Sequence, residues 1–402
     1  GQQVSSGDWP HQAEGRVRLS GNIMADATIR RAISLVGFPA WVGAVVLTLL
    51  TAGCATVERE PRPPVFYPPL PNPPRIQYLA TFSQARDAGD KPSGFAEFVL
   101  GKETPDSDSV RKPYGVAIHE GKILVADTRG NGYAQFDLVA KRFDFILGRG
   151  GGAMQKPINI TVDRDGTRYV TDTGRNQILS FDRNNKFLKA YGVKDQFKPS
   201  DVAVSDNRLY VVDLQHHQIH VLDKASGKTM GKLGKAGSKD GELFQPTNIA
   251  LGPDNHLYVT DTGNFRVQKL TLDGQFVASY GSIGSGIGKF ARPKGVALDR
   301  DGRLYVVDAA FENVQVFDRD GKLLMFFGAP GEAPESINLP TVVTIDYDNV
   351  RLFQKYAEPK FQLEYVILVA SQFGANKVNA YGFGRMEGID YSVVDRAAER
   401  TR

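Results

Sequence analysis

Short apolar runs separated by turn residues recur along the chain from residue 113 to residue 383. One unit contains four such runs: Asn248–Leu251, Leu257–Thr260, Val267–Leu270 and Phe276–Tyr280, joined by GPDN, DTGNF and LDG turns. The first run is apolar on both faces, whereas the third and fourth alternate apolar with polar residues, as half-exposed strands do. The unit is therefore predicted to form one four-stranded antiparallel sheet.

The same unit occurs six times, although the sixth copy is degraded. The copies begin at Pro113, Pro157, Pro199, Pro246, Pro293 and Pro340, at spacings of 44, 42, 47, 47 and 47 residues. Spacings of this size are typical of propeller blades, and the runs lack the 3.6-residue period of helical repeats. Because a single sheet of this kind cannot bury its apolar faces alone, we predict an all-β fold, a six-bladed β-propeller.

Closure of the predicted ring needs a partner strand for the last blade. The sixth copy supplies only three clear strands: Val342–Ile345, Tyr365–Ala370 and Val378–Phe383. Upstream, IQYLATF at Ile76–Phe82 matches the fourth-strand pattern of FVASY and LLMFF, so this latch strand is predicted to cover the exposed edge of blade six. The propeller is then expected over residues 75–385, with insertions at 83–110 and 346–364 and a tail at 386–402.

The second-strand and turn segments VADTRGN, VTDTGRN and VTDTGNF resemble the signature of NHL repeats. The resemblance extends over roughly residues 75–385 and implies a six-bladed propeller of the NHL/TolB-like type. NHL propellers serve as binding platforms, as receptor sensors and, in a few cases, as enzymes, so the resemblance alone does not define an activity.

One aspartate recurs in the turn after the second strand of each of the first five units. These residues are Asp127, Asp172, Asp213, Asp261 and Asp308. A carboxylate at this position can accept backbone N–H hydrogen bonds and hold the turn. We expect a structural role, since a catalytic residue is not usually repeated five times.

An export signal is predicted ahead of the propeller. Arg30 and Arg31 precede an uncharged run, residues 32–53, that ends in TLLTAGC at Cys54. A basic segment, an apolar segment and small residues before a cysteine resemble a bacterial lipoprotein signal, which implies lipid attachment at Cys54. Met24 is the expected start, with residues 1–23 upstream or added and 24–53 as signal peptide. Thr51 departs from the lipoprotein pattern, and an uncleaved membrane-spanning helix is the alternative.

Both alternatives place the propeller in the cell envelope. Ala55 after the cysteine favours an outer-membrane lipoprotein, either periplasmic or surface-exposed. Cys54 is the only cysteine, so no disulfide and no thiolate metal cluster is expected. Residues 54–74 are rich in proline and are expected to form neither helix nor sheet, but a tether holding the propeller on the order of 50 Å from the lipid.

Basic residues gather around the predicted starts of the innermost strands. We call the face reached by these starts and by the turns after the second strands the top face. Its predicted ring contains Arg111, Lys112, Lys156, Lys198, Arg292 and Lys294, with Arg129, Arg175 and Arg266 further out. The opposite face carries more acidic turns, although the net charge is only +4. Such a ring would attract an anionic partner, unless its residues are simply soluble loop positions paired with acids.

Two kinds of metal site are the alternatives, both implied by resemblance to propeller enzymes. One is a peptidyl-hydroxyglycine lyase with histidine-ligated zinc, which needs three converging ligands. The six histidines of the chain are His11, His119, His216, His217, His220 and His256. Since His216, His217 and His220 all belong to blade three, no trio of histidines from separate blades is expected. The other is a lactonase-like calcium site at the channel end, from Asn159, Asp201 and Asn248.

The sequence thus favours an envelope-anchored, non-catalytic binding or assembly platform without a cofactor. The expected partner is an exported protein or an acidic polysaccharide, not nucleic acid, and the chain is expected to be a monomer or part of a larger envelope complex. A metal-dependent propeller enzyme, with calcium or zinc, remains the alternative.

Overall fold

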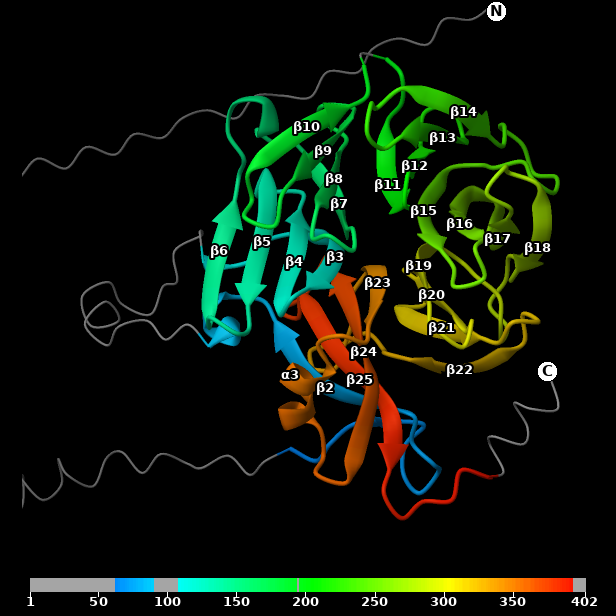
Figure 1. The fold of residues 1–402 in the computed structure, drawn as a ribbon. Coiled ribbons are helices and arrows are strands. Elements are labelled where there is room, and N and C mark those ends of the chain that lie inside the picture. The colour runs from blue at the N-terminus through cyan, green and yellow to red at the C-terminus, as the bar shows by residue number, and fades with distance from the viewer. Residues whose placement is uncertain (1–61, 90–107, 194, 393–402) are drawn as a thin grey trace, which may run out of the picture. The chain divides into compact units, whose positions relative to one another are not determined.

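The protein is described by a computed structural model over residues 62–89, 108–193 and 195–392. Its strands form six antiparallel sheets, five with four strands and one with five. Figure 1 shows the first strands of the six sheets, β3, β7, β11, β15, β19 and β23, around a common centre. The prediction of an all-β, six-bladed propeller is confirmed.

Blades one to five each contain four consecutive strands. Blade one contains β3 (Pro113–His119), β4 (Lys122–Asp127), β5 (Gly132–Asp137) and β6 (Arg142–Ile146). Blade two contains β7 (Pro157–Val162), β8 (Arg168–Asp172), β9 (Gln177–Phe181) and β10 (Phe187–Tyr191). Blade three contains β11 (Pro199–Val204), β12 (Arg208–Asp213), β13 (Gln218–Asp223) and β14 (Thr229–Leu233). Blade four contains β15 (Pro246–Leu251), β16 (Leu257–Asp261), β17 (Arg266–Leu270) and β18 (Phe276–Tyr280). Blade five contains β19 (Pro293–Leu298), β20 (Leu304–Asp308), β21 (Asn313–Phe317) and β22 (Leu323–Phe327).

Blade six is built from both ends of the described chain. In strand order it contains β1 (Phe66–Tyr67), β2 (Ile76–Phe82), β25 (Val378–Met386), β24 (Phe361–Ser371) and β23 (Pro340–Asp346). The latch strand β2 runs antiparallel to β25, with Ile76 opposite Phe383 and Phe82 opposite Val378. The predicted closure of the last blade by this N-terminal strand is confirmed.

The core lies between the blades, because each sheet buries apolar side chains on both faces. Each of the six interfaces between neighbouring blades has its own cluster of buried apolar residues. At the seam between blades six and one, Phe82 of the latch strand packs edge to face against Phe136 and Phe353. The Thr341 hydroxyl of blade six donates a hydrogen bond of 2.6 Å to the Tyr114 carbonyl of blade one.

The proline-rich segment departs from the prediction that it forms neither helix nor sheet. Phe66 and Tyr67 form the short edge strand β1, paired with Gln77 and Ile76 of the latch strand. An edge strand tolerates prolines on either side, provided that the paired residues themselves are not prolines. Burial of Phe66 against Phe361 supports the pairing. The described part of the predicted tether is therefore partly attached to the propeller.

Short helices occur in both insertions and in two connections between strands. In the described residues these are η1 (Ala85–Ala88), η3 (Gly150–Gly152), η4 (Thr262–Asn264), α3 (Val350–Phe353) and η5 (Gln354–Tyr356). Past the last strand, the start of the tail also packs on the propeller, since the buried Tyr391 hydroxyl donates to the Pro74 carbonyl. The predictions for Cys54, the signal peptide and most of the 83–110 insertion lie outside the described residues. Within the described ranges, none of the helices has the length and apolar character needed to cross a bilayer.

Candidate functional site: the channel mouth and the top face

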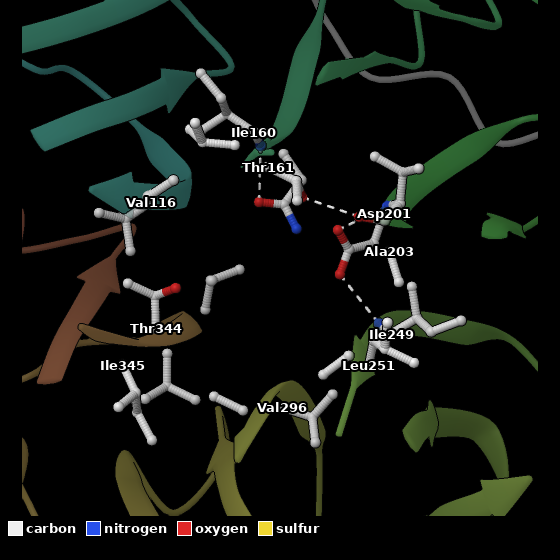
Figure 2. Close-up of a pocket in the computed structure, with 18 of the residues that line it drawn as sticks. Val116, Ile160, Thr161, Asp201, Ala203, Ile249, Leu251, Val296, Thr344 and Ile345 are labelled. Carbon is white, nitrogen blue, oxygen red and sulfur yellow. Dashed lines mark hydrogen bonds between the residues drawn. The ribbon is translucent and has the colours of Figure 1, made fainter. Parts of the chain in front are cut away.

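The innermost strands enclose a central channel. A cavity of about 340 Å³ is lined by residues of all six of these strands. Much of the lining is branched aliphatic, for example Val116, Ile249 and Ile345 (Figure 2). Asn159 and Asp201 supply an amide and a carboxyl group. Asn159 is the third residue of β7, and Asp201 is the third residue of β11. Both therefore lie close to the top face, where these strands begin. The channel therefore has an amide and a carboxyl at its mouth, and deeper down two threonines, Thr161 and Thr344, among branched aliphatic side chains.

Asp201 is a buried carboxyl at this mouth. One of its oxygens accepts the Val202 N–H at 2.8 Å, and the other accepts the Ile249 N–H at 3.0 Å and the Asn248 Nδ2 at 3.2 Å. Figure 2 shows the carboxyl reaching from blade three toward Ile249 of blade four. Burial raises the pKa of Asp201 to about 7, although the hydrogen bonds act to lower it. This carboxyl thus bridges two blades and changes charge near neutral pH.

The oxygen atoms at the mouth fit calcium poorly. Calcium takes roughly six to eight oxygen ligands, usually with several carboxylates. The three residues of the predicted site offer one carboxyl and two amides, and both Asp201 oxygens and the Asn159 Oδ1 already accept hydrogen bonds. The Asn248 Oδ1 is buried without a hydrogen-bond partner. The structure brings Asp201 and Asn248 together as a hydrogen-bonded pair, and the three residues offer fewer carboxylate oxygens than a calcium site usually has.

Tyr114, Arg292 and Lys294 share the electrostatic environment of the mouth. Burial raises the pKa of Tyr114, the Asp201 carboxyl raises it further, and the Arg292 guanidinium lowers it. Burial lowers the pKa of Lys294 to about 8, and the charge of Arg292 lowers it further. Blades one, three and five therefore interact across the channel mouth. Perturbed titratable groups gathered in a cleft are a candidate for a functional site.

The five repeated aspartates are fully buried at the ends of the second strands. In blades one, two and five, each carboxylate accepts backbone N–H groups from its own turn and from the loop before the blade-starting proline. For Asp172 the donors are the N–H groups of Gln155, Lys156, Gly174 and Arg175. These contacts tie the start of the first strand to the turn after the second.

The predicted basic residues differ in what their side chains contact. Arg266 donates to Asp261 Oδ2 at 2.9 Å and to two carbonyls, and Arg175 donates to the carbonyls of Gly151 and Ala153, so both support loops. Lys112 lies over the Phe373 ring. The exposed group contains Lys156, Lys198, Arg292 and Arg129, whose side chains have no hydrogen bond or ion pair to any described residue.

Several cations of the opposite face form ion pairs with aspartates. Lys224 lies 2.8 Å from Asp163, Lys269 lies 2.8 Å from Asp254, and Arg303 lies 2.6 Å from Asp299. All three aspartates are in or beside turns after a first strand. Both faces therefore carry partnered cations, and the exposed side chains of Lys156, Lys198 and Arg292 lie beside the starts of the innermost strands, around the channel mouth.

The histidines of blade three separate into two settings. His217 accepts the Gln245 N–H and packs on Phe244, whereas His216 and His220 both contact Asp213. The Oδ2 atom of Asp213 is 2.6 Å from His216 Nδ1 and 3.0 Å from His220 Nε2. Burial alone would raise the pKa of Asp213, but hydrogen bonds from His220, the Lys198 N–H and His216 hold it well below its usual range.

Neither this cluster nor the burial of Tyr114 near Asp201 and Arg292 was predicted from the sequence. From the sequence, Asp213 is expected to hold a turn, and the three histidines of blade three are not expected to supply a zinc site with ligands from separate blades. The signal that connects them is their spacing of three and seven residues after the repeated aspartate, at the positions of Asn264 and Gln268 in blade four.

Comparisons with known proteins agree with this architecture. Residues 245–270 match the family model of the NHL repeat. The propeller thus contains an NHL repeat. The chain is 31% identical over 132 residues to a probable peptidyl-alpha-hydroxyglycine alpha-amidating lyase from Caenorhabditis elegans, a match covering 30% of this chain and 38% of that protein. It is 26% identical over 148 residues to NHL repeat-containing protein 2 from Gallus gallus, covering 29% and 20%. This NHL propeller therefore spans less than half the length of either relative.

Solved structures with the same fold include both an enzyme and a binding protein. A gluconolactonase from Xanthomonas campestris superposes with a TM-score of 0.51 at 17% identity, over 81% of this chain and 99% of that one. An auxiliary nutrient binding protein from Bacteroides ovatus superposes with a TM-score of 0.51 at 14% identity, over 69% and 70%. At such low identity the likeness concerns the fold alone, so function rests on this chain's own residues.

Proposed function

We propose that this NHL propeller is a non-catalytic binding platform that holds an anionic partner on its top face. The observation that carries the proposal is the rim of Lys156, Lys198 and Arg292. Their side chains are exposed around the channel mouth without a partner among the described residues. Exposed, unpaired cations gathered on one face are suited to contact a negatively charged surface.

The spread of the rim favours a long polyanion. Lys156, Lys198 and Arg292 belong to the loops that lead into blades two, three and five, so one small ligand would not reach all of them. A single exposed ion pair contributes only about 0–1 kcal/mol, and useful affinity therefore needs several contacts at once. An acidic polysaccharide meets this requirement, and an exported protein with an acidic surface is the second candidate of the same kind.

The proposal is tested by reversing the rim charges. The triple variant Lys156→Glu, Lys198→Glu, Arg292→Glu should bind immobilised polygalacturonate on the order of 100-fold more weakly than wild type, since three contacts become repulsive. The matched control is Arg164→Glu, Lys186→Glu, Lys322→Glu on the opposite face, which should bind within a few-fold of wild type. Equal binding by the two triple variants would show that the rim is not the binding surface.

The chemical nature of the partner is read from a second arm. If polygalacturonate does not bind at all, the same three proteins are used to capture acidic proteins from an envelope extract. A protein that binds to wild type and to the control variant, but not to the rim variant, would then be the partner. Binding of polygalacturonate that weakens as salt is raised would identify the polysaccharide.

Attachment to the cell envelope through Cys54 belongs to the same proposal. The Cys54→Ser variant should lose lipid labelling and move from the membrane fraction to the soluble envelope fraction. Retention of that variant in the membrane would instead support an uncleaved helix over residues 32–53.

A further inference from the structure

The cluster of Asp213, His216 and His220 has the donor atoms of a metal site. Asp213 Oδ2, His216 Nδ1 and His220 Nε2 all lie within 4.8 Å of one another. The carboxylate and His220 are buried, with 0% and 1% of their side chains exposed, whereas His216 is 40% exposed. The three atoms therefore converge at a point that is closed on the protein side and open to solvent on one side.

Blade three departs from the other blades in how its turn aspartate is used. In blades one, two and five, the Oδ2 atom accepts a backbone N–H from the residue two before the blade-starting proline, namely Arg111, Gln155 and Ala291. In blade three, Asp213 Oδ1 accepts the N–H groups of Lys198 and Gln215, and Oδ2 faces the two imidazoles. One carboxylate oxygen is thus released from the backbone of its blade.

Blade four shows the same geometry without ligand atoms. Asn264 Nδ2 and Gln268 Nε2 donate to Asp261 Oδ2 at 2.8 and 3.0 Å, from the positions that correspond to His216 and His220. An amide nitrogen has no lone pair to give to a metal, whereas an imidazole nitrogen has one in the appropriate tautomer. Blade three therefore replaces two hydrogen-bond donors with two potential ligands around an equivalent carboxylate.

The environment of His220 permits the required tautomer. Its ring packs against Phe197, and its Nδ1 atom is buried without a hydrogen-bond partner. Because Nδ1 is unpaired whether or not it holds the proton, no contact at that atom opposes moving the proton there and leaving the Nε2 lone pair free. Gln218 Nε2 lies 3.2 Å from His220 Nε2, so this amide adjoins the open side of the cluster.

We propose that Asp213, His216 and His220 bind one divalent transition-metal ion of the zinc type. Two nitrogens and one carboxylate oxygen, with a fourth position open to solvent, match the donor set that zinc accepts, and two nitrogen ligands disfavour calcium and magnesium. Ligand atoms around tetrahedral zinc are about 3.3 Å apart, so Asp213 Oδ2 needs to move about 0.7 Å away from His216 Nδ1 and about 0.3 Å away from His220 Nε2. The two imidazole nitrogens, which lie within 4.8 Å of each other, need to reach the same spacing. The inference is independent of the anionic partner proposed above.

The test uses the full chain without a polyhistidine tag and Zn²⁺ as the probe. Calorimetric titration should show one Zn²⁺ bound per chain, and Co²⁺ should give the visible absorption of a low-coordinate nitrogen and oxygen site. The variant His216→Asn, His220→Gln, which installs the blade-four residues, should weaken Zn²⁺ binding by more than the roughly 100-fold typical for loss of an outer-shell partner.

Two measurements keep the test decisive. The control His256→Ala, on the opposite face, should bind Zn²⁺ as wild type does, and Zn²⁺ should raise the thermal midpoint of wild type but not of the double variant. Since the double variant retains donors to Asp213, it should fold in the absence of metal. If wild type binds no Zn²⁺, or if the double variant binds it equally well, the cluster is a hydrogen-bonding turn like that of blade four and the proposal is wrong.

Discussion

The Asp201 carboxyl makes the stability of the propeller depend on pH in a way that one substitution should remove. Asp201→Asn replaces an ionisable group by an amide of nearly the same shape. The amide oxygen can still accept the Val202 N–H, but its NH2 group cannot accept the Ile249 N–H. An unpaired buried donor costs about 1–3 kcal/mol, so the variant should be less stable than wild type at low pH.

The dependence of the unfolding free energy on pH follows from the raised pKa of Asp201. The unfolded chain has its Asp pKa near 3.8, whereas burial raises the folded-state pKa of Asp201 to about 7. The folded protein therefore binds a proton that the unfolded chain has lost, and stability from this group falls as pH rises from about 4 through 7. Between about pH 4.5 and pH 8 the loss amounts to about 3 kcal/mol.

The assay is urea unfolding followed by far-ultraviolet circular dichroism at several pH values. The difference in unfolding free energy between wild type and Asp201→Asn should change by about 3 kcal/mol over this range, in favour of the variant at high pH. In the control Asp165→Asn the difference should stay constant, because the Thr167 backbone N–H lowers the pKa of Asp165 and its transition lies below this range. A constant difference for Asp201→Asn would refute the reasoning.

Three further outcomes follow from burial and pairing. Phe82→Ala in the latch strand should lower the unfolding free energy by about 3–5 kcal/mol, measured in urea, because Phe82 is 1% exposed in the seam between the first and last blades. Burial lowers the pKa of Lys294 to about 8, below its unfolded value, so wild type should gain stability between about pH 8 and 10, up to about 3 kcal/mol, while Lys294→Met should show no such gain. Arg266→Ala should lower the unfolding free energy by about 1–3 kcal/mol by removing a donor to buried Asp261, whereas Lys156→Ala should stay within about 0.5 kcal/mol of wild type in the same urea titration.

The blades and their closure could be predicted because each depends on a local pattern that repeats. The blade-starting prolines, the apolar runs and the aspartate turns recur at nearly constant spacing, and IQYLATF carries the alternation of a fourth strand. The edge strand of Phe66 and Tyr67 could not be predicted in this way. A strand of two residues in a proline-rich segment shows no periodicity, and packing against Phe361, almost three hundred residues away in sequence, supports its pairing.

The residues of the candidate site could be predicted from the sequence, but the contacts of their side chains could not. Sequence position placed Lys156, Lys198 and Arg266 on one face, yet only three-dimensional proximity shows that Arg266 is held by Asp261 while the two lysines are free of partners within the described ranges. The lowered pKa of Lys294 depends on burial and on Arg292, neither of which is encoded by local spacing. Contacts between side chains of different blades cannot be predicted from the sequence of one repeat.

If the top face binds anions as proposed, the buried turn aspartates explain how it does so without being strongly charged as a whole. Each of the five carries a negative charge beneath the rim, and each is fully buried and held by N–H donors or, in blades three and four, also by side chains. At a distance their charges offset those of the exposed lysines and arginines, in keeping with a net charge of only +4. At contact, a ligand meets the exposed cations and not the carboxylates below them. Because steering depends on the distant field and dissociation on the contacts, recognition on this face should depend mainly on how long the partner stays bound.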